Sequence, residues 1–313
     1  MKRKILITGG AGFIGSSLAE RLAKDADNFV VIADNLLTGS LSKIPKSIHQ
    51  NVKFIKANAN DIMDIASIFH AYQFDYVFHY AAVVGVKRTL ANPVVVLHDI
   101  TGINNILNLS KNTGVKRVFY TSSSEVYGEP VEYPQNEYTT PLNSRLPYAI
   151  VKNVGEAYLR SYKREYDLDF TIFRLFNTFG PKQSTDFVIS KFLLAALKDK
   201  DITIYGDGSQ TRTFCYIDDH LEATVNAFYN NLVINDVANI GSDNEITILD
   251  LAKTIIKLTK SRSKIIHMPS LKEGDMTRRR PDVTKMKDLL NRDFTSLETG
   301  LNAILKDRQY VIA

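Results

Sequence analysis

Residues 4–15 read KILITGGAGFIG, an apolar run that passes directly into a glycine-rich turn. The run predicts a buried strand over residues 4–8, and leucines at helical spacing predict a helix over 16–24. Glycines in the turn would let backbone N–H groups approach a pyrophosphate, and the N-terminus of the helix would add positive potential. The sequence therefore predicts a dinucleotide-binding strand–turn–helix. The residues of the turn that would line the cofactor are Gly9, Gly12, Phe13, Ile14 and Gly15.

An acidic residue follows the second predicted strand, which covers residues 29–33. This residue, Asp34, comes nineteen positions after Gly15. A carboxylate at this place can accept hydrogen bonds from both ribose hydroxyls, and it would repel a 2′-phosphate. A glycine turn that serves packing alone is the simpler alternative, and Asp34 weighs against it. We therefore expect a tightly bound NAD rather than NADP.

The first half of the chain alternates short β-branched runs with helical patterns. Further strands are predicted at 52–55, 76–79 and 118–121, and a helix at 99–112. Strands separated by helices imply an α/β fold with a doubly wound parallel sheet, whose ligands bind at the carboxyl ends of the strands. In the second half, the pattern predicts a strand at 202–204 and helices at 188–198, 219–230, 248–259 and 297–305.

We expect two domains from this pattern. Residues 1–180 would form the NAD-binding domain with the catalytic residues. Residues 181–313 would form a smaller lobe that binds the substrate, with some of its chain returning to the first domain.

Composition excludes several classes of protein. The 313 residues carry a net charge of +5, and the only basic cluster is 278–280, so no nucleic-acid partner is predicted. Cys215 is the only cysteine, which excludes an internal disulfide, and the six histidines lack metal-ligand spacing; we expect no metal. The longest apolar runs are too short to span a bilayer, and no export signal is read, so the expected compartment is the cytoplasm.

A possible catalytic group lies in the middle of the chain. Tyr148 and Lys152 are four residues apart and would share one helical face. A phenol titrates near ~10 in water, and a neighbouring ammonium with a nicotinium charge would lower that pKa, so the tyrosine could act as a base. The stretch 121–128, TSSSEVYG, follows a predicted strand and would aim a serine hydroxyl into the ligand crevice. A surface Tyr–Lys pair beside an ordinary turn is the alternative.

Across nearly its whole length, the chain resembles the extended short-chain dehydrogenase/reductases, in the branch of nucleotide-sugar epimerases and dehydratases. The resemblance rests on motifs in a fixed order. In the cofactor half, these are residues 8–15 (TGGAGFIG), 34–35 (the ribose-binding pair), 61–62 (the adenine contact) and 80–82 (the HxAA turn). In the second half, they are residues 174–181 (RxxNxxGP), 205–212 (YGxGxQxR) and 274–282 (the late arginine motif).

The resemblance implies a role for each matched residue. Ser123, Tyr148 and Lys152 would be the catalytic triad of an enzyme that oxidises the C4 hydroxyl of a nucleotide-diphosphate sugar to a ketone. The further NAD contacts would be Asp34, Asn35, Asp61, Ile62, Ala81 and Ala82, beside Tyr148 and Lys152. The substrate contacts would be Asn177, Val188, Tyr205, Arg212, and Arg278 or Arg279. Family members commonly form dimers through helices near 100–113 and 149–166, so we expect a homodimer.

Two residues bear on the reaction that follows C4 oxidation. Family dehydratases carry Thr-Asp-Glu where this chain has Ser123-Ser124-Glu125, and a serine is too weak an acid to protonate a departing hydroxyl. Glu125 in turn counts against plain 4-epimerisation. The arrangement most resembles UDP-glucuronate decarboxylases, but residues 83–89 and Asp99 depart from their pattern. Decarboxylation, 4-epimerisation, release of the keto sugar and a non-catalytic NAD sensor remain open.

Overall fold

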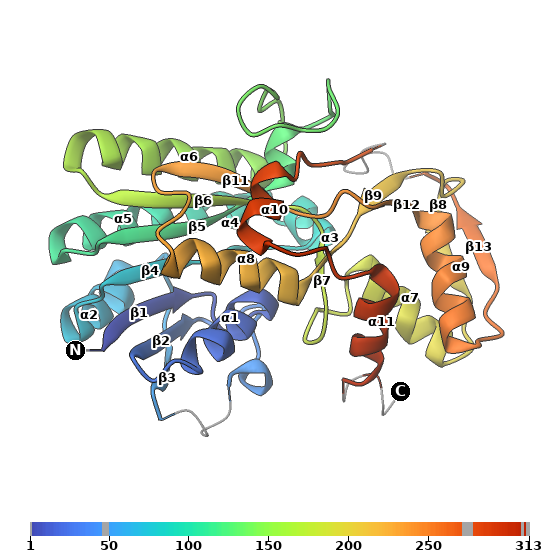
Figure 1. Ribbon diagram of the computed structural model, residues 1–313, viewed down its shortest axis with the longest axis horizontal. Helices are drawn as coiled ribbons and strands as arrows, with labels where there is room; N and C mark the ends of the chain where they lie inside the picture. Colours follow the sequence, from blue (N-terminus) through green and yellow to red (C-terminus); the bar gives the residue numbers. More distant parts are fainter. Residues whose placement is uncertain (1, 46–49, 271–277, 308–309, 311–313) are drawn as a thin grey trace. The chain divides into compact units, whose positions relative to one another are not determined.

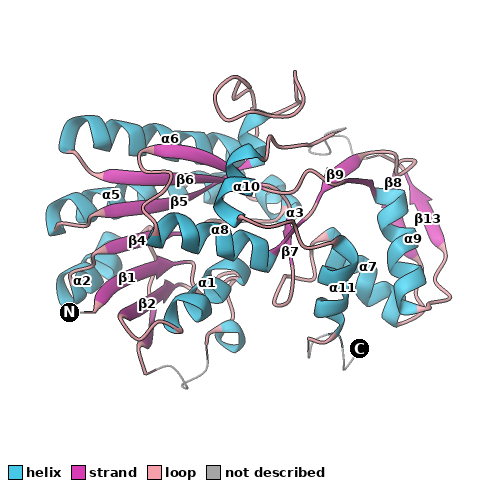
Figure 2. Cartoon of the chain, in the orientation of Figure 1, coloured by secondary structure: helices cyan, strands magenta, loops and turns pink. Residues whose placement is uncertain are grey.

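A seven-stranded sheet is the central element of the computed structural model, which describes all residues except 1, 46–49, 271–277, 308–309 and 311–313 (Figures 1 and 2). The strand order is β11-β6-β5-β4-β1-β2-β3. β1 lies between β2 and β4 and is parallel to both, and β3 and β5 continue the parallel pairing on either side. The strands are β1 Arg3–Thr8, β2 Asn28–Asp34, β3 Val52–Lys56, β4 Tyr76–His79, β5 Arg117–Ser123, β6 Asp169–Leu175 and β11 Asp236–Ile240. The predicted doubly wound α/β fold is confirmed.

Helices cover the sheet because its strands are apolar on both faces. Ile65, Ile106 and Leu159, from three helices, share one core cluster with Val118 of β5. On the opposite face, the ring of Phe228 packs on Phe78 and Phe119, with centroids 5.7 and 5.8 Å away. The helices that contact or follow these strands are α1 Phe13–Ala23, α2 Ile62–Tyr72, α3 Val86–Ala91, α4 Pro93–Leu97, α5 Asp99–Thr113, α6 Pro147–Tyr166 and α8 Ile217–Tyr229.

The predicted strands all lie within or at observed ones, but two strands of the sheet were not predicted. β6 reads DFTIFRL, in which an aspartate, a threonine and an arginine interrupt the apolar residues, and only its last two residues were interpreted, as the start of the RxxNxxGP motif. β11 belongs to chain that returns after α8. The first helix begins at Phe13, three residues before the predicted start, because the glycine turn ends at its N-cap, Gly12.

The second part of the chain has its own small sheets. β7 pairs with β10 and β8 with β13, both in parallel, whereas β9 pairs with β12 in antiparallel. These strands are β7 Thr178–Phe179, β8 Ile202–Tyr205, β9 Thr211–Thr213, β10 Cys215–Tyr216, β12 Glu245–Thr247 and β13 Ile265–Met268. The helices are α7 Val188–Leu197, α9 Ile248–Thr259, α10 Thr284–Leu290 and α11 Leu297–Leu305.

The chain divides into two compact units that are interleaved in sequence. Unit 1 comprises Met1–Val126, Ser144–Arg174 and Thr224–Ala238; unit 2 comprises Tyr127–Asn143, Leu175–Ala223 and Asn239–Ala313. The prediction places the main boundary after residue 180 and expects some later chain to return to the first domain. In the structure, Thr224–Ala238 belongs to unit 1 and Tyr127–Asn143 belongs to unit 2. The assignment of cofactor binding to the first domain and substrate binding to the second stays a proposal.

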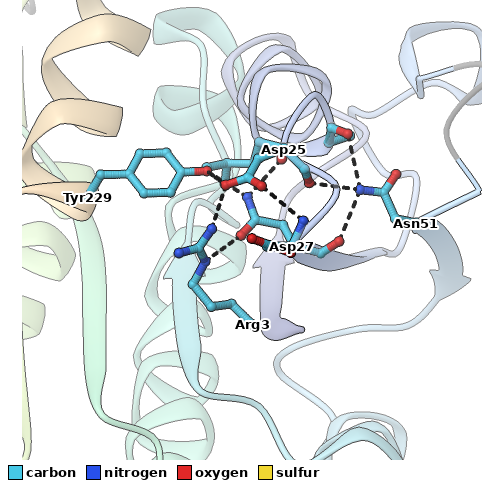
Figure 3. A network of polar contacts seen from close by, with 8 residues as sticks. Arg3, Asp25, Asp27, Asn51 and Tyr229 are labelled. Carbon is cyan, nitrogen blue, oxygen red and sulfur yellow. Dashed lines mark hydrogen bonds and ion pairs between the residues drawn. The ribbon is translucent and has the colours of Figure 1, made fainter. Parts of the chain in front are cut away.

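A polar cluster ties together the sheet edge at which β1 begins (Figure 3). The Arg3 guanidinium donates to Asp25 and to the Asn28 side chain, the latter at 2.8 Å. The Tyr229 hydroxyl donates to Asp25 at 2.9 Å and accepts from Asn28 at 2.8 Å. The Asn51 amide donates to three backbone carbonyls at 3.0–3.2 Å. This cluster joins the start of β1, the turn between α1 and β2, and the end of α8. It therefore stabilises the amino-terminal end of the central strands, opposite their carboxyl ends.

Candidate active site

The glycine turn is shaped by contacts that a side chain would block. Gly9 has φ +68°, and a Cβ there would lie 2.6 Å from the backbone nitrogen of Ala81. A Cβ on Gly15 would lie 2.4 Å from the carbonyl oxygen of Gly9. α1 starts after Gly12, which has no side chain to cap it, so no cap from that residue covers the first-turn N–H groups. This cradle fits a pyrophosphate at a helix N-terminus.

Asp34 is held at the end of β2 by the same turn. Its carboxylate accepts hydrogen bonds from Ala11 N at 2.9 Å and from Leu36 N at 2.7 Å, and the residue is 8% exposed. A Cβ on Gly39 would lie 2.7 Å from its Oδ1, so this glycine leaves room for the carboxylate. A fixed carboxylate at this strand end is the group that the ribose of NAD requires.

The other predicted cofactor residues lie near the carboxyl ends of neighbouring strands. Asn35 follows β2, and its side chain accepts from Leu37 N at 2.9 Å. Asp61 is the N-cap of α2, with Oδ1 accepting from Met63 N at 2.9 Å, and Ile62 is the first, exposed residue of that helix. Ala81 and Ala82 follow β4 and are half-buried.

Lys152 is buried beneath Tyr148 in α6. Its Nζ donates to the carbonyl oxygen of Thr121 at 2.7 Å and lies 5.7 Å from the centroid of the Tyr148 ring. Burial lowers the pKa of Lys152 to about 8, and the negative charge of Asp99 partly opposes that shift. Lys152 thus contacts the carboxyl-terminal part of β5 and lies beside the Tyr148 ring, while the catalytic role of this pair stays a prediction.

The serine-rich segment ends β5 and turns away from it. Ser123 is the last residue of the strand, is 7% exposed, and accepts a hydrogen bond from Glu125 N at 3.2 Å. Ser124 and Glu125 begin a short 3₁₀ helix, Ser124–Tyr127. Ser124 is buried and Glu125 is partly exposed. A hydroxyl and a carboxyl thus occupy the strand end where ligands bind in this fold.

Asp99 is a structural residue of the site that sequence reasoning noted only as a departure from the family. Its Oδ2 accepts from Val83 N at 2.7 Å, and its Oδ1 accepts from the Asn60 amide at 3.1 Å. It therefore joins the turn after β4 to the loop before α2. An asparagine in its place would offer one acceptor oxygen to these two donors, so its own NH₂ group would face one of them. A buried acid at the start of an amphipathic helix was the available signal.

The predicted substrate residues lie in unit 2. The side-chain amide of Asn177, between β6 and β7, donates to Thr213 O at 3.2 Å. Arg212 lies in β9, paired with Ile246 of β12, and its Nη1 donates to Thr211 O at 2.7 Å. Val188 is the first residue of α7, and Tyr205 is the last residue of β8 and exposed.

The late arginine segment is organised by one carboxylate. Arg278 donates through Nε and Nη2 to the two oxygens of Glu245, at 2.7 and 2.6 Å, and its guanidinium lies 4.5 Å from the centroid of the Tyr133 ring. One edge of this guanidinium is thereby bound to Glu245, and one of its faces lies over Tyr133. Arg279 is 5% exposed. The motif's Gly274 and Asp275 lie outside the described residues.

The described residues contain neither a metal-ligand cluster nor a membrane-spanning helix. Within that part of the chain, no group of three or more His, Cys, Asp or Glu side chains could hold a metal ion. None of its helices combines the length and apolar character needed to cross a membrane.

The model of the NAD dependent epimerase/dehydratase family matches residues 5–241. The chain belongs to this family. The match covers the glycine turn, the Tyr–Lys pair and the predicted diphosphate loop. The chain is thus an NAD-dependent enzyme of the short-chain dehydrogenase/reductase type, and the predicted family and cofactor are confirmed.

Other members of the epimerase/dehydratase family resemble the chain over its full length. A UDP-N-acetyl-alpha-D-glucosaminuronate decarboxylase of Bacillus cytotoxicus is 38% identical over 320 residues, covering 98% of this chain and 98% of that protein. UDP-glucuronic acid decarboxylase 1 of Danio rerio is 36% identical over 314 residues, which cover 97% of this chain and 72% of that protein. The solved structure of UDP-glucose 4-epimerase from Thermotoga maritima with UDP-glucose matches with a TM-score of 0.92 at 31% identity, covering 99% and 100%.

Proposed function

We propose that the chain decarboxylates a UDP-linked hexuronic acid, by C4 oxidation, loss of carbon dioxide and return of the hydride to C4. The observation that carries this proposal is the pair Ser124–Glu125 at the end of β5. It offers one carboxyl group without the neighbouring aspartate that dehydration would use. The full-length similarity to the Bacillus uronate decarboxylase supports the same reaction.

The first step is oxidation of the C4 hydroxyl. Tyr148 accepts the hydroxyl proton, the buried ammonium of Lys152 favours the phenolate, and Ser123 hydrogen-bonds the reacting oxygen. Bound NAD supplies the acceptor, and later the donor, for the C4 hydride. The glycine turn and the Asp34 carboxylate are the residues that would hold the pyrophosphate and the ribose of this cofactor.

The second step uses the new ketone. A C4 ketone makes the C6 carboxylate a β-keto acid, so the C5–C6 bond breaks, carbon dioxide leaves, and the electron pair passes into an enolate at C4 and C5. C5 then takes a proton, which we assign to the Glu125 carboxyl. The hydride returns to C4 while Tyr148 returns its proton to the C4 oxygen, which restores the hydroxyl. The net reaction consumes no oxidant and yields a UDP-pentose.

The diphosphate requires positively charged donors. Arg212 and Arg278, with the Asn177 amide, are the groups that we propose for this role, because guanidinium groups bind phosphate oxygens in pairs. Glu245 binds the Nε and Nη2 donors of Arg278, and we assign its Nη1 donors to the anion.

One experiment separates the candidate reactions. The protein is incubated with UDP-glucuronate, UDP-N-acetylglucosaminuronate and UDP-glucose, and the products are followed by mass spectrometry and proton NMR. We expect a UDP-pentose and carbon dioxide from one of the uronates. Products of unchanged mass would overturn decarboxylation and favour the second candidate, a 4-epimerase, which the match to the Thermotoga enzyme supports. No turnover of any UDP-sugar would overturn both.

We further propose that the active form is a homodimer in the cytoplasm, formed through α5 and α6. Ile150 and Tyr166, both on α6, are 40% and 49% exposed, so this helix presents apolar surface. Sedimentation analysis of the purified chain tests this, because a monomer at assay concentration would contradict it.

A further inference from the structure

A buried ion pair joins α6 to β6, one helical turn after Lys152. Glu156 of α6 is 1% exposed and Arg174 of β6 is 2% exposed. Arg174 donates through Nε to Oε1 at 2.9 Å and through Nη2 to Oε2 at 2.7 Å. The hydroxyl of Ser122 donates to the same Oε1 at 2.6 Å. The Glu156 carboxylate therefore joins one helix to two neighbouring strands of the sheet.

The contacts of α6 with β5 follow one another in register. Lys152 binds the carbonyl oxygen of Thr121, and Glu156, one helical turn later, binds the hydroxyl of Ser122. Ser123 is the next residue of the strand, and Tyr148 lies one turn before Lys152 on the same face of the helix. The two anchors thus fix how far α6 is shifted along β5, and with it the position of Tyr148 relative to Ser123.

Stability alone does not explain this pair. Taking two charges out of water offsets most of their attraction, and apolar residues of similar volume often stabilise a core equally well. Compared with an apolar residue such as leucine at position 156, a carboxylate adds directional hydrogen bonds. Glu156 makes three hydrogen bonds, to groups from β5 and β6, so its orientation is fixed on both sides.

We propose that Glu156 is a positioning residue for the reaction, with Ser122 and Arg174 as its anchors. It holds α6 so that Tyr148 and Lys152 meet the substrate beside Ser123. This inference rests on the roles proposed above for those three residues. The proposal also gives a role to Arg174, the first residue of the RxxNxxGP motif, that is separate from substrate binding. Arg174 orients the Glu156 carboxylate, and Glu156 in turn positions α6.

The test separates positioning from stability. Glu156→Gln leaves the Arg174 charge buried without its counter-charge, so its Tm falls. The double variant Glu156→Leu, Arg174→Met removes both charges, and we expect its Tm to return toward that of the wild type. Its kcat stays lower by about 10- to 100-fold, because small displacements of reacting groups have effects of this order. KM for the nucleotide sugar and the affinity for NAD change little.

Hydrogen exchange provides a readout that does not require turnover. Amides in the first two turns of α6 exchange faster in the double variant than in the wild type at equal Tm. The control is Asp219→Asn, which alters a buried carboxylate of unit 2 that is ion-paired to Arg292 at 2.8 Å. This control lowers Tm without lowering kcat measured well below the transition.

Recovery of kcat together with Tm in the double variant would overturn the proposal, as would wild-type exchange in α6. If the wild type turns over none of the UDP-sugars, the proposed function fails, but hydrogen exchange still decides whether Glu156 anchors the helix.

Discussion

The ammonium of Lys152 donates a hydrogen bond to the backbone carbonyl of Thr121, at 2.7 Å, from a side chain that is almost entirely buried. The lysine therefore links the helix that carries Tyr148 to the strand that ends in Ser123. Its charge is kept out of water, and burial lowers its pKa from 10.5 to about 8. Holding this charge costs the folded chain stability.

Replacing Lys152 with methionine removes that cost. The pKa difference corresponds to about 3 kcal/mol, the upper limit of the gain at neutral pH, since Thr121 also loses a hydrogen bond. Between pH 8 and 10.5 the unfolded wild type binds more protons than the folded one, so its stability rises with pH and the advantage of Lys152→Met shrinks. Urea unfolding at several pH values measures this. The control is Lys163→Met: Lys163 donates a hydrogen bond to Asp167, which raises its pKa, so the substitution gives no gain in stability.

Tyr148→Phe removes the proposed base without changing packing. We expect turnover to fall by about 10²- to 10⁴-fold, with Tm and NAD affinity unchanged. The control is Tyr158→Phe, on the same helix, whose ring packs 6.4 Å from that of Tyr162. Unchanged turnover in Tyr148→Phe would remove this residue from its role.

Glu125→Gln separates the two halves of the reaction. C4 oxidation continues, so a single turnover produces NADH absorbance, but the steps at C5 are blocked and no UDP-pentose appears. The exposed neighbour Glu129 provides the control, because Glu129→Gln should form product at the wild-type rate. Equal loss of oxidation and product formation would mean that Glu125 is structural.

Gly155→Ala tests the fit of α6 on β5. A Cβ at this position would lie 2.3 Å from the hydroxyl oxygen of Tyr120, a fully buried side chain. Overpacking of this kind destabilises by about 1–3 kcal/mol, which exceeds the roughly 1 kcal/mol that alanine gains in a helix. Thermal unfolding should show a lower Tm. A second change, Tyr120→Leu, should recover part of the loss; a Gly155→Ala variant as stable as the wild type would contradict the packing.

Tyr229→Phe tests the polar cluster of Figure 3. The hydroxyl donates to Asp25 and accepts from Asn28, so its removal should lower the free energy of unfolding by about 1 kcal/mol. The cluster braces the edge of the sheet away from the site, and kcat and KM should therefore not change. A loss of activity in a fully folded Tyr229→Phe variant would contradict this, because it would mean that the polar cluster affects catalysis.

The cofactor side of the molecule could be predicted because its signals are local. The glycine turn lies within seven residues, and Asp34 ends the adjacent strand, so spacing alone placed them. The Tyr148–Lys152 pair shares one helix face, and here too a short-range pattern was sufficient.

The partners of the charged residues could not be predicted in this way. Glu156 binds Arg174, 18 residues later, and Glu245 binds Arg278, 33 residues later. In neither pair do the two residues lie on the same helix or strand. No periodicity marks such contacts, because the sheet order and the paired strands create them. For the same reason β11 was missed: it joins β6 only after the chain has passed through α7 and α8.

That late return of β11 has a consequence for how the protein is made. The ribosome releases β6 early, but the strand that completes the sheet beside it begins only at residue 236. At roughly 5–20 residues per second, the newborn edge of β6 waits a few seconds or more for its neighbour. An unpaired strand edge can pair with another chain. The edge of β6 is therefore open to pairing with another chain while the segment between β6 and β11 is being translated.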